Sequence, residues 1–231
     1  MNNIKLQNKI FSLPNKDKEG NWVETYDEKI HGLNRMVAPF RALFCSRPNG
    51  GKSTVMVNCF LQIQAGGTPF EVVIVVQPSS SMEWDFIDPT MIVNDIPDIE
   101  SIVDEDHKKT LIIFDDFELT KLNSLQQQRI NILFRYGSSH MGISVMLSYQ
   151  SFFSIPSIIR KCCNYFYIWR TQNIDEINII SKRCGFNKKV FQKLFKKYII
   201  DKHDFLLIDT VRDDIRKNIY EIIPKEEYNE F

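Results

Sequence analysis

The feature that most constrains this chain is a glycine-rich loop that joins an apolar run to a helix-like segment. The loop reads Ser46-Arg47-Pro48-Asn49-Gly50-Gly51-Lys52-Ser53. Residues 41–45 before it are mainly apolar, and residues 52–65 after it contain no glycine or proline, which predicts a strand and then a helix. Glycines let the backbone curl around an anion with its N–H groups inward, and the helix N-terminus faces the same anion. The sequence therefore predicts a phosphate-binding loop.

The loop fits the pattern G-x-x-x-x-G-K-[ST] except at its first position, where a serine replaces glycine. The lysine of the pattern reaches the β- and γ-phosphates of a nucleotide, and the next hydroxyl ligates Mg²⁺. The alternative, a chance turn of the same composition, is disfavoured by the strand and helix on either side. We expect ATP and Mg²⁺ as cofactors, and we expect the nucleotide-binding residues to be Ser46, Pro48, Asn49, Gly50, Gly51, Lys52, Ser53 and Thr54.

A second acidic motif follows a buried strand about 60 residues downstream. The apolar strand 110–114 ends at Asp115 and Asp116. We assign Asp115, together with Ser53, to Mg²⁺ and Asp116 to the role of general base that activates water. A helix N-cap pair is the alternative reading of two such acids. The double acid favours ATP hydrolysis, and the chain lacks the Asn-Lys-x-Asp signature that recognises guanine.

Polar residues outside these two motifs are candidates for sensing or stabilising the reaction. Gln150 ends the predicted strand 143–148, beside the phosphate loop, where its amide would reach the γ-phosphate or the attacking water. An exposed strand-end glutamine is the alternative. Arg135, Arg160 and Arg170 are candidates for a cation supplied to a neighbouring subunit, although each one alone is more typical of a surface salt bridge.

Strand-like and helix-like segments alternate along the chain. We predict strands at 71–77, 110–114, 143–148 and 165–169, helices at 52–65, from the acidic pair to about 136, at 174–183 and at 188–198, and a terminal antiparallel pair at 205–209 and 220–223. Residues 78–108 are acidic and loop-rich, with short helical pieces. This alternation predicts a mostly parallel sheet flanked by helices. Together with the phosphate loop it indicates an α/β P-loop NTPase fold, which we assign to the RecA-like (ASCE) type. We expect residues 1–38 to form an N-terminal extension and residues 39–231 the ATPase domain.

Composition limits the partners of this chain. Its 29 basic and 29 acidic residues balance, whereas a protein that coats nucleic acid usually has a basic excess, so any nucleic-acid contact is expected to be local. No apolar stretch approaches the roughly 20 residues that span a bilayer, so we expect no membrane contact and a soluble protein. Five cysteines without CxxC spacing indicate reduced thiols in an intracellular compartment.

Three segments together resemble a known family. They are residues 42–54 with the phosphate loop, residues 111–117 with the acidic pair, and residues 134–150 followed by 154–160, the most specific of the three. This arrangement is similar to the genome-packaging ATPases of poxviruses, other large DNA viruses, virophages and Polinton elements, which belong to the FtsK–HerA superfamily. The similarity covers about residues 40–210.

The resemblance assigns Lys52 and Ser53 to nucleotide and Mg²⁺, the acidic pair to the Walker B motif, and Gln150 to the sensor. Ser139 stands where members often carry an arginine before the histidine, here His140, and Arg135 on the same predicted helix is our candidate to replace it.

The resemblance implies an ATP-driven motor that works as a homopentameric or homohexameric ring. The ring would translocate double-stranded DNA into a preformed capsid, with capsid or portal proteins as partners, in the virion or at a viral assembly site inside the host cell. A small-molecule phosphotransferase and an ATP-binding assembly module that translocates nothing are the alternatives. Lysines at 188–189 or 196–197 are candidates for DNA contacts, and equally for solvated helix faces.

Overall fold

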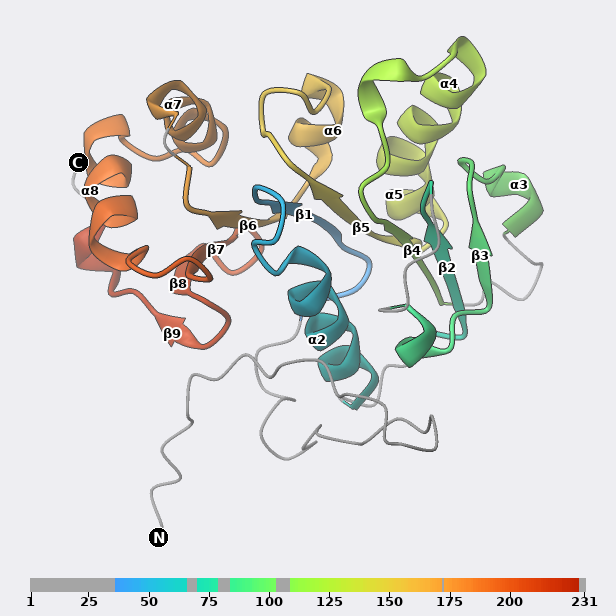
Figure 1. The fold of residues 1–231 in the computed structure, drawn as a ribbon, viewed down its shortest axis with the longest axis horizontal. Helices are drawn as coiled ribbons and strands as arrows, with labels where there is room; N and C mark the ends of the chain where they lie inside the picture. The colour runs from blue at the N-terminus through green and yellow to red at the C-terminus, as the bar shows by residue number, and fades with distance from the viewer. Residues whose placement is uncertain (1–35, 66–69, 79–83, 103–108, 172, 229–231) are drawn as a thin grey trace, which may run out of the picture.

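The protein folds around a single nine-stranded sheet with helices on both faces (Figure 1). The computed structural model describes residues 36–65, 70–78, 84–102, 109–171 and 173–228. The strand order is β3-β2-β4-β5-β1-β6-β7-β8-β9, in which the pairs from β3 to β6 are parallel and those from β6 to β9 antiparallel. The strands are β1 (Arg41–Cys45), β2 (Val72–Val76), β3 (Met91–Val93), β4 (Thr110–Phe114), β5 (Ser144–Tyr149), β6 (Tyr165–Trp169), β7 (Phe205–Asp209), β8 (Asp214–Lys217) and β9 (Glu221–Ile222).

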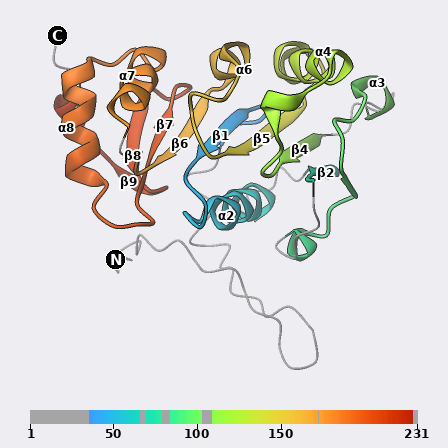
Figure 2. The ribbon, with the colours of Figure 1, turned by 45° about the horizontal axis from the view of Figure 1, so that its top comes forward.

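The helices form two unequal layers. Figure 2 shows α2 on one face of the sheet and α4, α6 and α7 on the other. The helices are α2 (Lys52–Ala65), α3 (Ile99–Ile102), α4 (Ser124–Ile132), α5 (Ser138–His140), α6 (Ser157–Cys162), α7 (Ile174–Arg183) and α8 (Lys188–Tyr198), with short helical turns η2 (Asp85–Ile87), η3 (Leu119–Lys121) and η5 (Lys225–Glu227) and a π-helical turn η4 (Leu133–Gly137). No helix in these described ranges is long and apolar enough to cross a membrane.

The central strands are buried on both faces because their sequences are continuous apolar runs. Side chains alternate along each strand, so Ile112 and Phe114 of β4 join the core beneath α4, α6 and α7, whereas Leu111 and Ile113 join the core beneath α2. All five residues of β4 are buried. These two apolar layers fix the sheet, and with it the strand ends that carry the polar residues.

The mostly parallel sheet and its antiparallel C-terminal group confirm the predicted fold class. The predicted direct pairing of 205–209 with 220–223 is wrong, because β8 lies between them and pairs with both β7 and β9. We missed β8 because its sequence, Asp-Ile-Arg-Lys, is mostly charged. The buried Arg216 is compensated there by Asp209 and Asp214, at 3.7 and 2.8 Å.

Other boundaries differ from the sequence predictions. The segment after the acidic pair is not one helix to residue 136 but η3, α4, η4 and α5 in succession, with α4 started by an Asn123–Gln126 capping box. Strand β3 and helix α6 were not predicted. All five cysteines are free thiols. Of the predicted N-terminal extension 1–38, residues 1–35 lie outside the described residues, so the domain boundary stays a prediction.

Candidate nucleotide-binding site

The strand order gathers the predicted polar residues at one edge of the sheet. Strand β5 lies between β1, which leads into the phosphate loop, and β4, which leads into the acidic pair. In parallel sheets this carboxyl edge is where ligands bind. A cavity of about 400 Å³ opens there, and it is lined by Pro48, Asn49, Gly50, Gly51, Lys52, Ser53, Thr54, Gln77, Pro78, Asp115, Asp116 and His203.

The phosphate loop has the backbone shape that anion binding requires. Asn49 and Gly51 have positive φ angles of 58° and 92°, so the chain turns sharply before α2 begins at Lys52. The first residues of α2 line the cavity, which directs the positive end of the helix into it. The Lys52 Nζ lies 3.2 Å from the Ser46 carbonyl oxygen and 3.8 Å from Asp116 Oδ1. The lysine therefore bridges the loop and the acidic pair.

Ser46 is the residue that departs from the loop pattern, and it does not line the nucleotide cavity. Its Oγ donates to the Arg47 carbonyl oxygen at 3.0 Å, and its N–H donates to the Tyr149 carbonyl oxygen at 3.1 Å. A Cβ placed on Gly50 would lie 1.8 Å from the Ser46 Oγ. The serine therefore fills the space beside Gly50 and leaves no room for a side chain there.

Asp115 is a buried carboxylate that is satisfied by three side chains. Ser148 Oγ donates to its Oδ1 at 2.7 Å, Ser53 Oγ donates to its Oδ2 at 3.1 Å, and Trp84 Nε1 donates to its Oδ2 at 2.9 Å. Ser148 Oγ also accepts the Asp116 N–H at 2.9 Å. One hydroxyl at the end of β5 therefore orients both acids. Three donors around one carboxylate fix its orientation at the end of β4.

The donor set of this cavity fits Mg²⁺. Ser53 and Asp115 supply a hydroxyl and a carboxylate, which are the hard oxygen ligands that Mg²⁺ prefers. Mg²⁺ is usually held by one or two carboxylates together with substrate phosphates and waters. Among the described residues no cluster of three or more His, Cys, Asp or Glu side chains forms an all-protein metal site. The cavity therefore suits a metal that arrives with a nucleotide.

Asp116 and Gln150 meet in a second cavity of about 340 Å³ beside the first. Asp116 lines both of these cavities. Of the two, Gln150 lines the second, together with Glu118 and Tyr149. The Asp116 side chain is 55% exposed, and its φ of 47° turns the chain out of β4. Hydrogen bonds from Thr120, and then from the Tyr149 hydroxyl, lower the pKa of Glu118. The second cavity is therefore polar and carries negative charge.

The predicted arginines lie elsewhere. Arg135 is exposed on η4 and lines a separate cavity with residues of α4 and α5, none of which belongs to the phosphate loop or the acidic pair. Arg160 lies over the Phe152 ring, 5.3 Å from its centroid, and burial lowers its pKa. Arg170 is nearer, in a cavity behind the loop that it shares with Arg47. The structure thus brings Lys52, Ser53, Asp115 and Asp116 together in one chain, and it keeps Arg135 apart from them.

Four residues of the site were not singled out from the sequence. Ser148 and Trp84 hold Asp115. Gln77, 4% exposed at the end of β2, lines the cavity with an Nε2 that has no hydrogen-bond partner among the described residues. His203 Nδ1 lies 3.3 Å from the Gly50 carbonyl oxygen. Gln77 and Ser148 lie at the ends of the two strands that flank β4. Their positions at strand ends are a sequence signal that indicates this edge of the sheet. Trp84 and His203 arrive from loops whose sequences carry no such signal.

Comparison with known proteins identifies the fold. No family model and no curated protein matches the sequence. The DNA-packaging ATPase B204 from Sulfolobus turreted icosahedral virus matches the structure with a TM-score of 0.58 and 17% identity, over 79% of this chain and 98% of that one. The chain has a P-loop NTPase fold.

Further solved structures agree with this P-loop fold. The genome packaging NTPase B204 from Sulfolobus turreted icosahedral virus 2, in complex with AMPPCP, has a TM-score of 0.58 and 17% identity over 79% of this chain and 98% of that one. EssC (ATPases 2 and 3) from Geobacillus thermodenitrificans has a TM-score of 0.56 and 12% identity over 79% of this chain and 40% of that one. At these identities the likeness concerns the fold.

Proposed function

We propose that this protein is an ATPase that works in an oligomeric ring and drives double-stranded viral DNA into a preformed capsid. The observation that carries the hydrolysis is the convergence of Lys52, Ser53, Asp115 and Asp116 on one cavity. The packaging role is supported by likeness to a protein named as a DNA-packaging ATPase, almost all of which this chain covers.

In this proposal four residues that line the cavity, and Gln150 in the adjoining cavity, each have a chemical role. Lys52 binds the β- and γ-phosphates. Ser53 and Asp115 would hold Mg²⁺, which would supply positive charge against the charge that develops on the phosphates. The Lys52 Nζ lies 3.8 Å from Asp116 Oδ1, and phosphate binding would draw the ammonium away from this carboxylate. Asp116 is then free to orient the attacking water and accept its proton. Gln150, from the adjoining cavity, contacts that water or the γ-phosphate.

The proposed ring gives Arg135 a role. Within one chain, Arg135 lies in a cavity separate from the nucleotide site. Because a transition-state arginine is often supplied by a second protein, we assign Arg135 to the site of a neighbouring subunit. The partners of the ring are double-stranded DNA and capsid or portal proteins, at a viral assembly site or in the virion.

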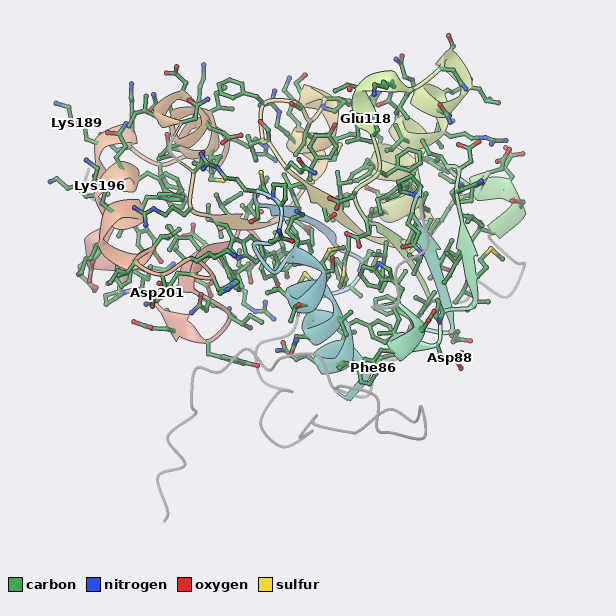
Figure 3. The ribbon with its side chains drawn as sticks, in the orientation of Figure 1. Phe86, Asp88, Glu118, Lys189, Lys196 and Asp201 are labelled. Carbon is green, nitrogen blue, oxygen red and sulfur yellow. The ribbon has the colours of Figure 1, made fainter. Side chains whose placement is uncertain are left out.

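Steady-state ATP hydrolysis with and without double-stranded DNA tests this proposal. We expect DNA to stimulate turnover in the wild type, and we expect Lys52→Ala and Asp116→Asn to abolish turnover. Asp88→Asn is a matched control for Asp116→Asn, because Asp88 is also exposed with a φ of 47°, and asparagine tolerates this conformation. Figure 3 shows Asp88 at the outer edge of the molecule.

The outcomes separate the candidate functions. Turnover that DNA does not change contradicts the motor, and phosphate transfer to a nucleoside favours a phosphotransferase instead. Nucleotide binding without turnover in an oligomer of established size favours an assembly module. Asp116→Asn should still bind nucleotide, because Lys52, Ser53 and Asp115 remain. Loss of nucleotide binding in Asp116→Asn would contradict its assignment as the base.

A further inference from the structure

The exposed side of α8 is an isolated basic surface. The helix reads Lys-Lys-Val-Phe-Gln-Lys-Leu-Phe-Lys-Lys-Tyr and contains five lysines and no acidic residue. Lys189, Lys193 and Lys196 follow one another at four- and three-residue spacing, which places them on one side of the helix. Figure 3 shows Lys189 and Lys196 extending away from the body of the molecule at its edge. We call these three residues the lysine face.

The positive charge of this face is not neutralised within the described part of the chain. Of the five α8 lysines, only Lys197 forms an ion pair there, with Glu227 at 2.7 Å. Glu227 contacts the C-terminal end of α8, and Figure 3 places Asp201 near that end too, away from Lys189. Because like charges four residues apart destabilise a helix, Lys189 and Lys193 cost stability unless an anion binds them.

The rest of α8 is fixed, so the lysine face is presented rigidly. Val190, Phe191, Leu194 and Phe195 are buried in the core, and the helix packs against α7 and β7. Asn187 caps the helix by accepting backbone N–H groups from its first turn. A helix that binds a membrane needs a free apolar side, and the apolar side of α8 is occupied. The partner of this face is therefore a surface recognised by charge alone.

We propose that the lysine face of α8 binds the phosphate backbone of double-stranded DNA. The inference rests on the proposed DNA motor for the choice of polyanion. At about 1.5 Å per residue the three lysines span about 10 Å of helix axis, and duplex DNA carries one charge per about 1.7 Å. Contacts to phosphates carry no sequence information, so this surface holds any sequence equally, as a translocating protein requires.

The test is DNA binding over a series of salt concentrations, measured by fluorescence anisotropy with a labelled duplex of random sequence. The logarithm of the association constant falls as log salt concentration rises, and each phosphate contact adds about 0.9 to the steepness of that fall, which we call the slope. We expect Lys189→Gln/Lys193→Gln/Lys196→Gln to lower that slope by about 2.7 and to weaken binding at least tenfold at low salt. Lys193→Gln alone should lower the slope by about 0.9.

The matched control is Lys197→Gln, which removes the same charge from the same helix at the position already paired with Glu227. It should leave the slope unchanged. All variants should keep the wild-type circular dichroism spectrum and DNA-independent ATPase rate, since none of these lysines lines the nucleotide cavity. An unchanged slope in the triple variant overturns the proposal, and so does an equal loss in Lys197→Gln.

The same preparations separate this inference from the proposed motor. A slope that falls in the triple variant supports the lysine face, even where DNA fails to stimulate ATP hydrolysis by the wild type, a result that contradicts only the motor. DNA-stimulated turnover that the triple variant retains in full, with an unchanged slope, supports the motor and overturns the lysine face. Binding to anionic lipid vesicles but not to duplex DNA also overturns it.

Discussion

The variant Gly50→Ala tests a steric relation within the phosphate loop. We expect Ser46, which departs from the loop pattern, to fit there because residue 50 is a glycine without a side chain. A Cβ at Gly50 would lie 1.8 Å from Ser46 Oγ, 2.9 Å from Ser46 Cβ and 3.1 Å from the Arg47 carbonyl oxygen. Rotation of the Ser46 hydroxyl relieves the first contact but breaks its 3.0 Å hydrogen bond to that carbonyl. The second contact involves an atom next to the backbone, so the loop itself has to move.

Overpacking of this kind costs about 1–3 kcal/mol. Because nucleotide binding requires the loop in its present shape, we expect this cost to appear as weaker binding. At 1.4 kcal/mol per factor of ten, the dissociation constant for a nucleotide analogue with Mg²⁺ should rise about 5- to 150-fold. Ser46→Gly removes both of the nearest atoms, so Ser46→Gly/Gly50→Ala should recover most of the lost affinity.

Titration calorimetry on the four proteins of this double-mutant cycle measures the coupling between the two positions. We expect a coupling free energy of about 1–2 kcal/mol, with Ser46→Gly alone close to the wild type. Urea unfolding in parallel shows whether any loss is confined to the loop. Additive effects, with the double variant binding as weakly as Gly50→Ala, would refute the steric argument and place the requirement for Gly50 in its backbone instead.

Three further predictions concern other parts of the structure. Ser148→Ala removes the hydroxyl that orients both acids, and a hydrogen bond to a charged group is worth about 1.5–3 kcal/mol, so kcat/KM for ATP should fall about 10- to 150-fold in steady-state assays. Asp209→Ala removes one of the two aspartates that neutralise the buried Arg216, and urea denaturation should show a free energy of unfolding lower by about 3 kcal/mol; a loss under 1 kcal/mol contradicts this. Burial raises the pKa of the Cys59 and Cys163 thiols to about 12, so at pH 8 both stay protonated and should react with Ellman's reagent only after unfolding, as counted by absorbance.

The sequence predicts the central part of this fold well because two strong local signals coincide there. Continuous apolar runs identify β2, β4, β5 and β6, because such a run is the sequence pattern of a strand that is buried on both faces of a sheet. The phosphate loop and the acidic pair follow such runs directly, so their meeting at one sheet edge could be expected before the structure was known. In the structure both motifs line one cavity, with Lys52 from the phosphate loop and Asp115 from the acidic pair.

The remaining features depend on contacts between distant segments, and local patterns do not encode them. Strand β8 can be polar because the buried Arg216 pairs with Asp214 on its own strand and with Asp209 on the neighbouring strand, and the second contact exists only within the sheet. Trp84 reaches Asp115 from a loop 31 residues away, and His203 reaches Gly50 from 153 residues away. Such contacts can be recognised only from the three-dimensional arrangement of the segments.

The two edges of the sheet limit how copies of this chain can associate. One edge is β3, with three residues, and the other is β9, with two. Short edge strands offer few free main-chain groups, which disfavours the growth of one sheet into another. In the proposed ring, we therefore expect the described parts of neighbouring subunits to meet through side chains. Such interfaces would separate and re-form without breaking a ladder of backbone hydrogen bonds, which would let neighbours shift against one another during each cycle of the proposed motor.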